Sequence, residues 1–438
     1  MDRRDFLKSA AVGATAMGLA ACTAGTDEKK VVSKGEMASH MDGISLLGFG
    51  CMRWPTIEQE DGTKVIDQEL VNAMIDRALE AGVNYFDSAP VYVMGKSEEA
   101  TAKALLRHPR ESYYIATKCS NHRGSEYPAQ AGIDMYNKSL EYYQTDHIDY
   151  YLLHCLMGYE NFQKRFLDNG LLDFFLKERD LGHIRKLGWS YHGSEEDFYK
   201  ILELHDKYHW DFVQIQMNYQ DWEHANGEAN AKPMYEALAK AGIPVVIMEP
   251  LLGGQLSEVP AAVTDLLKTR EPEKSVASWA FRFCGSFPQI LTVLSGMTCM
   301  EHVEDNLDTF CNFKPLDEDD FALLRQAVEM KLNFPTVGCT GCQYCMPCPY
   351  GIDIPGIFRF YNRNINEGTY AATSEQKDYL RTRRKYLLAY DQAIPTVRQA
   401  DHCTGCGKCL EKCPQGIKIP SELQRIDQYL EKLKQNLL

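Results

Sequence analysis

Residues 84–92 have the sequence Asn-Tyr-Phe-Asp-Ser-Ala-Pro-Val-Tyr, a short apolar run that ends in Asp87 and is followed closely by Tyr92. The preceding segment carries apolar residues at helical spacing and ends in Gly82, a residue type that commonly follows the last turn of a helix. These apolar residues are Leu70, Val71, Met74, Ile75, Ala78 and Leu79. The region therefore predicts an amphipathic helix followed by a short buried strand with polar residues at its carboxyl end.

The same alternation of apolar runs and amphipathic segments extends from Ile44 to Leu307. The runs are Leu46–Cys51, Tyr85–Asp87, Tyr113–Thr117, Ile148–Leu153, Leu187–Ser190, Phe212–Met217, Val245–Met248 and Ile290–Leu294. Such runs separated by helical patterns predict an α/β fold, a parallel (β/α)8 TIM barrel. The spacing alone does not separate a closed barrel from an open, doubly wound sheet. No Gly-x-Gly-x-x-Gly motif follows any run, which counts against the open dinucleotide-binding sheet.

Polar residues follow several of the predicted strands. In a parallel barrel the catalytic groups lie at the carboxyl ends of the strands. Those ends carry Asp87 with Tyr92 shortly after it, then Lys118, then His154. A single tyrosine or histidine in such a position is more often structural, but the four together in this order favour a catalytic site.

Three segments of this region resemble the aldo-keto reductases. They are residues 84–92, Ile115-Ala116-Thr117-Lys118 and Asp149-Tyr150-Tyr151-Leu152-Leu153-His154. The resemblance implies a catalytic tetrad of Asp87, Tyr92, Lys118 and His154. Tyr92 would protonate the alkoxide that forms when a hydride reduces a carbonyl, and His154 would orient the carbonyl oxygen. Because a phenol with a pKa of about 10 is a poor acid, Lys118 would lower that pKa while Asp87 holds the lysine in place.

The resemblance extends to the positions at which this family binds a nicotinamide cofactor. These are Gly50, Met52, Ser190, Gln214, Ser295, Gly296, Glu301 and Asn306. The alternative interpretation is that these residues only close the barrel.

Two segments depart from the family pattern. Where many members have a tyrosine that stacks on the nicotinamide, this chain has Met248-Glu249-Pro250-Leu251. No basic residue occurs in Met297-Thr298-Cys299-Met300, where a cation would meet the 2′-phosphate of NADP. The second departure favours NAD(H), weak nicotinamide binding or none at all over NADP(H).

The chain contains 15 cysteines, and a repeated motif near the C-terminus holds many of them. Cys339-Thr340-Gly341-Cys342 recurs as Cys403-Thr404-Gly405-Cys406, and each repeat ends in Cys-Pro. The second repeat has the spacing of bacterial ferredoxins, Cys-x2-Cys-x2-Cys-x3-Cys-Pro. The first repeat has two residues, rather than three, before its fourth cysteine.

This spacing predicts two [4Fe-4S] clusters, because three close thiolates bind one cluster while the fourth reaches the other. Cluster one would take Cys339, Cys342, Cys345 and Cys413; cluster two would take Cys403, Cys406, Cys409 and Cys348. The shortened gap leaves the partners of Cys348 open. Two zinc sites are the alternative, although zinc has no need of the terminal Cys-Pro. The six cysteines in or beside apolar runs are expected to pack as small hydrophobic residues: Cys51, Cys119, Cys155, Cys284, Cys299 and Cys311.

The predicted organisation places the barrel at residues 44–312 and a helical, ferredoxin-like dicluster domain at residues 313–438. The segment Ile357–Tyr390, which is rich in basic and aromatic residues, predicts a helical insert between the cysteine repeats. Its basic run is interpreted as a solvated helix face rather than a docking site.

The N-terminus resembles an export signal. Arg3-Arg4-Asp5-Phe6-Leu7-Lys8 matches a twin-arginine signal, and Leu19-Ala20-Ala21-Cys22 matches a bacterial lipobox. Residues 1–21 would be removed, and residues 22–43 would tether the protein to a membrane through a lipid on Cys22. We therefore expect a periplasmic or cell-envelope lipoprotein, against the alternative of a chance basic N-terminus. A twin-arginine signal also favours a metallocofactor that is inserted before export.

The overall charge limits the classes of partner. The chain has 61 acidic and 47 basic residues and a formal net charge of −14, which argues against a nucleic-acid-binding protein. No apolar run is long enough for a membrane-spanning helix.

The first hypothesis is therefore an oxidoreductase that acts on a carbonyl or alcohol of a small molecule, with a sugar as one candidate. Its clusters would exchange electrons with an external redox partner. The second hypothesis is a membrane-anchored iron–sulfur electron-transfer protein whose barrel is a non-catalytic scaffold. Binding of a nicotinamide cofactor distinguishes the two.

Overall fold

The computed structural model describes residues 31–39, 43–311 and 313–438. The predicted export signal, Cys22 and part of the tether lie outside the described residues. Within the described ranges no helix is both long enough and apolar enough to cross a membrane.

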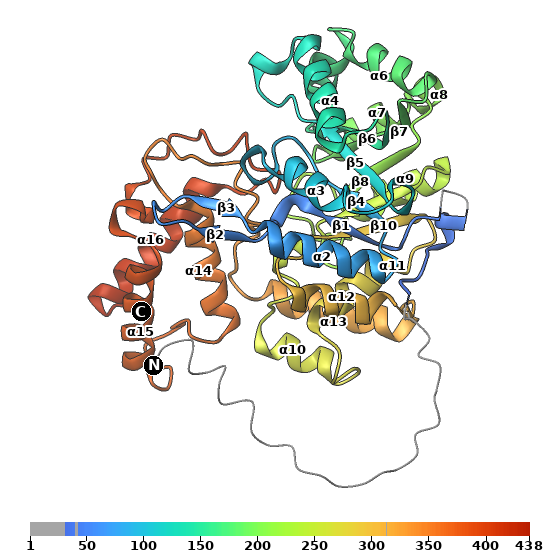
Figure 1. Ribbon diagram of the computed structural model, residues 1–438. Coiled ribbons are helices and arrows are strands. Elements are labelled where there is room, and N and C mark those ends of the chain that lie inside the picture. Colours follow the sequence, from blue (N-terminus) through green and yellow to red (C-terminus); the bar gives the residue numbers. More distant parts are fainter. Residues whose placement is uncertain (1–30, 40–42, 312) are drawn as a thin grey trace, which may run out of the picture. The chain divides into compact units, whose positions relative to one another are not determined.

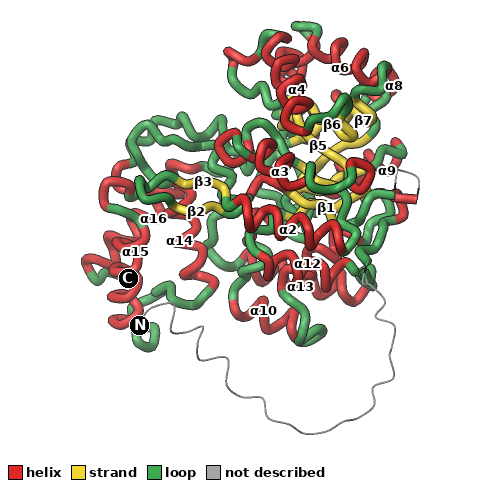
Figure 2. Tube along the Cα trace, viewed as in Figure 1, coloured by secondary structure: helices red, strands yellow, loops and turns green. Residues whose placement is uncertain are grey.

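Eight parallel strands form a closed barrel in the order β1-β10-β9-β8-β7-β6-β5-β4. They are β1 (Leu47–Gly50), β4 (Tyr85–Asp87), β5 (Tyr114–Cys119), β6 (Ile148–Leu156), β7 (Ile184–Tyr191), β8 (Phe212–Gln216), β9 (Val245–Met248) and β10 (Ile290–Ser295). Figure 2 shows these strands with helices around them. Each strand coincides with one of the predicted apolar runs, so the (β/α)8 barrel is confirmed.

Helices follow most of the strands. They are α2 (Gln68–Glu80), α3 (Ser97–Leu105), α4 (Ala129–Tyr143), α5 (Tyr159–Phe162), α6 (Leu171–Asp180), α7 (Glu195–Leu202), α8 (His205–Tyr208), α9 (Ala231–Ala241), α10 (Ala261–Lys268), α11 (Val276–Gly285) and α12 (Met300–Phe310). Helix α2 begins where the Asp67 carboxylate accepts a hydrogen bond from the backbone N–H of Leu70, at 3.0 Å. Its predicted apolar face is buried through Val71, Met74, Ile75 and Ala78, while Leu70 and Leu79 are half-buried.

An antiparallel hairpin of β2 (Thr56–Glu58) and β3 (Lys64–Ile66) follows the first barrel strand. It is largely exposed and was not expected, because its strands are only three residues long and carry no buried apolar face.

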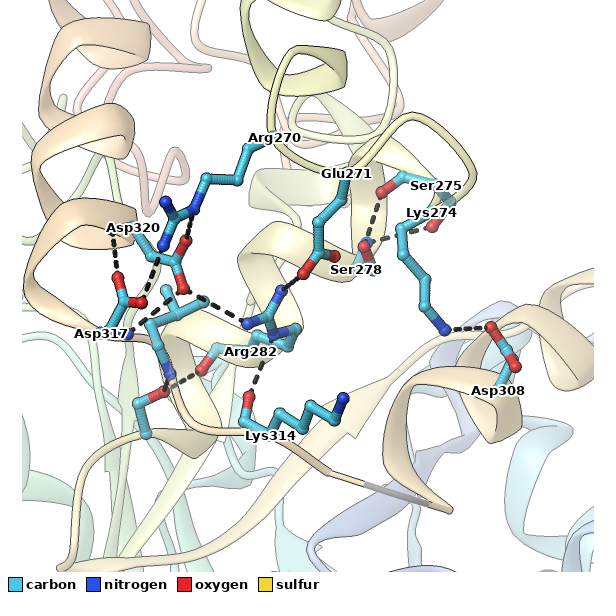
Figure 3. Close-up of polar contacts among 12 residues, drawn as sticks. Arg270, Glu271, Lys274, Ser275, Ser278, Arg282, Asp308, Lys314, Asp317 and Asp320 are labelled. Carbon is cyan, nitrogen blue, oxygen red and sulfur yellow. Dashed lines mark hydrogen bonds and ion pairs between the residues drawn. The ribbon is translucent and has the colours of Figure 1, made fainter.

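Helix α13 (Glu318–Leu332) packs on the barrel. The helix lies beyond residue 312, at which the sequence analysis placed the end of the barrel domain. Its residues Leu324, Ala327 and Val328 belong to the same hydrophobic core as the strands. Figure 3 shows the polar contacts at its first turn, where Asp320 lies 2.7 Å from Arg270 and 3.4 Å from Arg282. The barrel core therefore includes this helix.

The C-terminal segment has a second hydrophobic core of its own. Helices α14 (Ile354–Asn366), α15 (Tyr379–Ala393) and α16 (Ile419–Gln435) contact one another around it. The Arg383 side chain of α15 donates hydrogen bonds to the carbonyls of Leu433 and Lys434, at the end of α16. The predicted insert is therefore helical, and one of its basic residues caps a neighbouring helix.

Five of the six isolated cysteines are buried, while Cys299 is half-buried. Burial raises the pKa of the Cys155 thiol to about 11 and that of Cys119 to about 12. No described cysteine forms a disulfide.

Candidate active site

The strand register brings Asp87, Lys118 and His154 to one end of the barrel. Asp87 of β4 pairs with Ala116 of β5, and Lys118 lies two residues further along on the same face. Lys118 in turn pairs with Leu152 of β6, and His154 lies two residues beyond it. Adjacent parallel strands therefore place these three side chains at their carboxyl ends.

Lys118 and Asp87 form a buried ion pair. Lys118 Nζ lies 2.6 Å from Asp87 Oδ1 and also donates to the Ser88 carbonyl at 2.7 Å. Burial lowers the pKa of Lys118 and raises that of Asp87, and the attraction between the two charges opposes both shifts. Asp87 Oδ2 has no hydrogen-bond partner among the described residues.

Tyr92 lies beside this pair, in the turn of residues 92–95 that follows β4. Lys118 Nζ faces the Tyr92 ring at 5.0 Å from its centroid, and no hydrogen bond joins it to the Tyr92 hydroxyl within the described residues. Burial, and then the Asp87 carboxylate, raise the pKa of Tyr92 well above its usual value. The main contributions to this pKa all raise it, and the lowering of the Tyr92 pKa by Lys118 stays a prediction. Tyr92 is therefore a neutral phenol that retains its proton at neutral pH.

Three polar neighbours, Ser120, His122 and Arg165, hold His154. Its Nδ1 lies 2.6 Å from the Ser120 hydroxyl and 3.3 Å from Nε2 of His122, and Arg165 donates to its backbone carbonyl at 2.7 Å. Burial, and then the charges of His122, Lys118 and Arg165, lower the pKa of His154 well below 6.5. The tautomer decides which of the two atoms donates in the Ser120 contact. In the tautomer in which Ser120 donates to Nδ1, the neutral imidazole carries its proton on Nε2, where it can donate to a substrate oxygen.

One cavity of about 530 Å³ contains most of the predicted site. Its lining includes three members of the tetrad, Asp87, Tyr92 and His154, whereas Lys118 is buried behind them. Of the residues predicted to bind a nicotinamide, six line it: Gly50, Met52, Gln214, Ser295, Gly296 and Asn306. The volume lies within the usual range for a ligand pocket.

Ser190 and Glu301 have other positions. Ser190 is buried, does not line the cavity, and its hydroxyl accepts a hydrogen bond from the backbone N–H of Cys155 at 2.7 Å. Glu301 is exposed on the first turn of α12 and also lies outside the lining.

One polar group inside the cavity fits a carboxamide, and a second polar contact orders another part of the lining. Gln214 Nε2 lies 3.4 Å from the Met248 sulfur, which leaves the buried Gln214 Oε1 without a partner among the described residues. Asn306 donates to the Ser295 hydroxyl at 2.7 Å and so orders the far end of the cavity. The unpaired oxygen fits the amide N–H of a nicotinamide, since a buried acceptor normally has a donor.

The C-terminal cysteines gather in two groups. The charges of Cys342, Cys339 and Cys413 raise the pKa of Cys345 beyond the effect of burial, to about 12. In the same way, Cys403, Cys406 and Cys348 lie close enough to raise the pKa of Cys409. This grouping is the one that the predicted exchange of ligands requires. Among the described residues, no group of three or more His, Cys, Asp or Glu side chains is arranged to hold a single metal ion.

The first cysteine repeat, residues 339–348, forms a loop that lines one wall of the barrel cavity. Cys339, Cys342 and Tyr344 line it, as do Pro414 and Gln415 of the second repeat. Several hydrogen bonds hold the loop on the barrel: Arg53 Nη2 donates to the Thr340 carbonyl at 2.6 Å, Gln255 donates to the Cys339 carbonyl at 3.1 Å, and the Gln216 and Gln415 amides bond reciprocally at 3.1 and 2.8 Å.

Sequence reasoning missed Tyr344, His122 and Glu249 as site residues. The Tyr344 and His122 rings lie 6.4 Å apart, and Tyr344 raises the pKa of Tyr92. Glu249 lines the cavity, and burial raises its pKa although Arg53 opposes the shift. In the sequence, Glu249 was noted only as a departure from the family pattern. Tyr344 lies between two predicted cluster ligands, and the cysteine spacing predicts nothing about the residues between ligands.

A barrel whose strand ends bring an acid, a tyrosine and a histidine to one cavity, with a lysine buried behind them, has the site of an oxidoreductase. The chain belongs to the Aldo/keto reductase family, whose sequence model matches residues 46–329. A 4Fe-4S dicluster domain follows and matches residues 338–418.

Among curated relatives, L-galactose dehydrogenase of Arabidopsis thaliana is 24% identical over 304 residues, which cover 64% of this chain and 88% of the relative. The uncharacterized oxidoreductase YqkF of Bacillus subtilis is 24% identical over 310 residues, or 64% of this chain and 92% of the relative. Among solved structures, an aldo/keto reductase from Klebsiella pneumoniae in complex with NADP and acetate has a TM-score of 0.51 and 21% identity, and covers 68% of this chain and 95% of that chain. The last similarity concerns the fold.

Proposed function

We propose that this chain interconverts a carbonyl and an alcohol on a small-molecule substrate, with a nicotinamide dinucleotide as cofactor and two [4Fe-4S] clusters that exchange electrons with an external redox partner. The observation that carries the proposal is the shared cavity, which is lined by Asp87, Tyr92 and His154 and also by Cys339 and Cys342. The relative named L-galactose dehydrogenase supports a sugar as the class of substrate.

The tetrad residues act on the substrate oxygen. His154 donates a hydrogen bond from Nε2 and so orients the carbonyl toward Tyr92. The Tyr92 hydroxyl gives its proton to that oxygen as negative charge develops on it, and the Lys118 ammonium beside the ring stabilises the phenolate that remains. Asp87 keeps Lys118 charged and in place despite its burial. In the reverse direction, the same phenolate takes the proton of the alcohol.

A nicotinamide bound in this cavity would supply or accept the hydride. Gln214 Oε1 would accept a hydrogen bond from its carboxamide, and Ser295, Gly296 and Asn306 would contact the rest of the dinucleotide. The Klebsiella pneumoniae relative holds NADP, and no observation favours NAD(H) specifically. We therefore propose a nicotinamide dinucleotide without the preference for NAD(H) that the sequence suggested.

The two cysteine groups would hold the clusters: Cys339, Cys342, Cys345 and Cys413 around one, and Cys403, Cys406, Cys409 and Cys348 around the other. A hydride carries two electrons and each cluster transfers one, so the clusters would join this chemistry to the external redox partner through an intermediary that takes up two electrons and releases them one at a time.

The test uses anaerobically purified, cluster-loaded protein. We expect it to bind NADPH or NADH, to oxidise or reduce members of a sugar panel, and to lose roughly 10²–10⁴ of its turnover in the Tyr92→Phe variant. The variant should keep its dinucleotide affinity and its cluster spectrum. Unchanged turnover in Tyr92→Phe would contradict the proposed role of the tetrad, and wild-type protein with intact clusters but no dinucleotide binding would favour the electron-transfer scaffold.

We also propose that the chain is exported by the twin-arginine route and lipidated on Cys22. The supporting motifs are Arg3-Arg4-Asp5-Phe6-Leu7-Lys8 and Leu19-Ala20-Ala21-Cys22. Labelling of expressing bacteria with a radioactive fatty acid tests this: the wild-type chain should take up label, and Cys22→Ser should not. A cytoplasmic, unlabelled wild-type chain would contradict both parts.

A further inference from the structure

Helix α14 of the C-terminal domain contributes to the cavity that the barrel encloses. Arg359, Arg363 and Asn366 of this helix line it together with Gly296, Thr298 and His302 of the segment that follows β10. The Asn366 amide also donates to the Glu258 carbonyl in the segment after β9. Arg359 and Arg363 therefore line the same cavity as Met297 and Thr298, which belong to the stretch Met297-Thr298-Cys299-Met300 that contains no basic residue.

Two arginines converge at Gly341 in the wall of this cavity. A Cβ atom on Gly341 would lie 3.6 Å from Arg359 Nη2 and 4.0 Å from Arg53 Nη1. Arg53 comes from the barrel and is fixed by its Nη2 bond to the Thr340 carbonyl, so Nη1 stays available. Arg359 comes from α14 and has no hydrogen bond or ion pair with any described residue. Two guanidinium groups held together, one of them unpartnered, form an anion site.

Other ionisable groups share the cavity: the Cys339 thiol lies close enough to interact with both guanidinium groups, and Glu249 interacts with Arg53, but neither forms a hydrogen bond or ion pair with Arg359. Arg363, one turn after Arg359, is paired with Glu367 at 2.7 Å, but both side chains are at least half exposed and the pair is weak. The Asp305 carboxylate accepts from the Ser275 hydroxyl at 2.8 Å.

We propose that Arg359, together with Arg53, binds the phosphate groups of the nicotinamide dinucleotide, so that the C-terminal domain supplies the cation missing from the barrel. The inference rests on the proposed function, since it concerns the same cofactor. A guanidinium group can donate two parallel hydrogen bonds to the oxygens of one phosphate. The free N–H groups in this cavity can do so without first breaking an internal ion pair.

The test measures equilibrium binding of NADPH and NADH to cluster-loaded protein by fluorescence, for wild type, Arg359→Ala, Arg359→Lys and the control Arg384→Ala. Arg384 is an exposed arginine of α15 that does not line the cavity. We expect Arg359→Ala to weaken binding about 10- to 100-fold, Arg359→Lys to weaken it less, and Arg384→Ala to bind as wild type does. Iron content and EPR spectra of each variant show whether the clusters remain intact.

The two nucleotides distinguish the phosphates. A loss confined to NADPH assigns Arg359 to the 2′-phosphate, whereas an equal loss for NADH assigns it to the pyrophosphate, and either supports the proposal. Unchanged affinity in Arg359→Ala overturns it. If the reduction potential of a cluster shifts while the affinity stays unchanged, the arginine acts on that cluster instead. Equal losses in Arg359→Ala and Arg384→Ala also overturn it. If wild type binds neither nucleotide, the cofactor assignment itself has failed.

Discussion

At the residue scale, burial governs the chemistry of the site more than the proximity of single charges does. Lys118 and Asp87 are both inaccessible to solvent and lie 2.6 Å apart, so each compensates for the cost of burying the other. Tyr92, beside them, keeps its proton because the phenolate would be desolvated.

Removal of one member of the ion pair should cost more stability than removal of both. We expect Lys118→Met to lower the free energy of unfolding by about 3–5 kcal/mol, because it leaves the Asp87 carboxylate buried without a cation. The double variant Asp87→Asn/Lys118→Met should recover part of that loss. Denaturant unfolding of Lys118→Met, Asp87→Asn and the double variant measures the coupling between the two residues. Additive losses of stability would contradict that coupling.

Buried histidines should make stability fall on mild acidification. Burial lowers the pKa of His122 to about 3 and that of His192 to about 4, both below the ordinary 6.5. Between pH 4 and 6.5 the unfolded chain therefore binds more protons than the folded chain, so the free energy of unfolding falls as pH falls through this window. Each histidine contributes up to about 1.4 kcal/mol per pH unit.

Thermal unfolding between pH 5 and 7 measures this slope. His192→Gln should flatten it, while the control His302→Gln, at an exposed position of α12, should leave it unchanged. An equal slope in wild type and His192→Gln would be inconsistent with the assignment.

The sequence located most, but not all, of the residues in the site. Asp87, Tyr92 and His154 could be predicted because parallel strands place their carboxyl-end residues at one end of a barrel. Arg359 and Tyr344 could not, because their positions depend on where the C-terminal domain packs, which no local pattern encodes.

At the scale of elements, the apolar runs identified every barrel strand, because strands buried on both faces are nearly continuous in hydrophobicity. The β2–β3 hairpin lacked that signal. The position of α13 was missed for another reason: its contact with the barrel rests on side chains distant in sequence. Phe321 packs on the rings of Phe283 and Phe287, and Asp320 forms ion pairs with Arg270 and Arg282.

Gly253, in the turn after β9, is the glycine that the contact between barrel and cysteine loop requires. Its φ is +67°, and a Cβ atom would lie 2.3 Å from the Thr340 Cα. Gly254→Ala is a matched control, since that residue also has a positive φ, of +101°, but only the Ser257 hydroxyl, at 4.0 Å, lies near the position of a Cβ. We expect Gly253→Ala to destabilise by about 1–3 kcal/mol, more than Gly254→Ala, and to weaken dinucleotide binding.

Calorimetry and the fluorescence assay measure both effects. If the two alanine variants behave alike, backbone strain alone accounts for the loss, and the close approach to Thr340 is not important.

At the scale of the whole molecule, the barrel and the dicluster domain share a cavity, and this arrangement has a testable consequence. Cys342 lines that cavity, whereas Cys409 belongs to the other cysteine group. We expect Cys342→Ser to remove cluster one and weaken dinucleotide binding, while Cys409→Ser removes cluster two and leaves binding within about twofold of wild type.

Iron analysis and EPR identify the cluster that is lost, and dinucleotide titration measures the affinity. Equal affinity in Cys342→Ser and Cys409→Ser would show that the cysteine wall does not support the cofactor site.

The reciprocal amide pair between Gln216 and Gln415 has a consequence for evolution. Each amide presents a donor and an acceptor to the other, so a change at one position leaves a polar group of its partner unpaired. Substitutions at positions 216 and 415 are therefore expected to occur together among homologues of this chain. Correlated variation at these two positions, which are 199 residues apart, would mark the relatives in which a dicluster domain docks on the barrel in the same way.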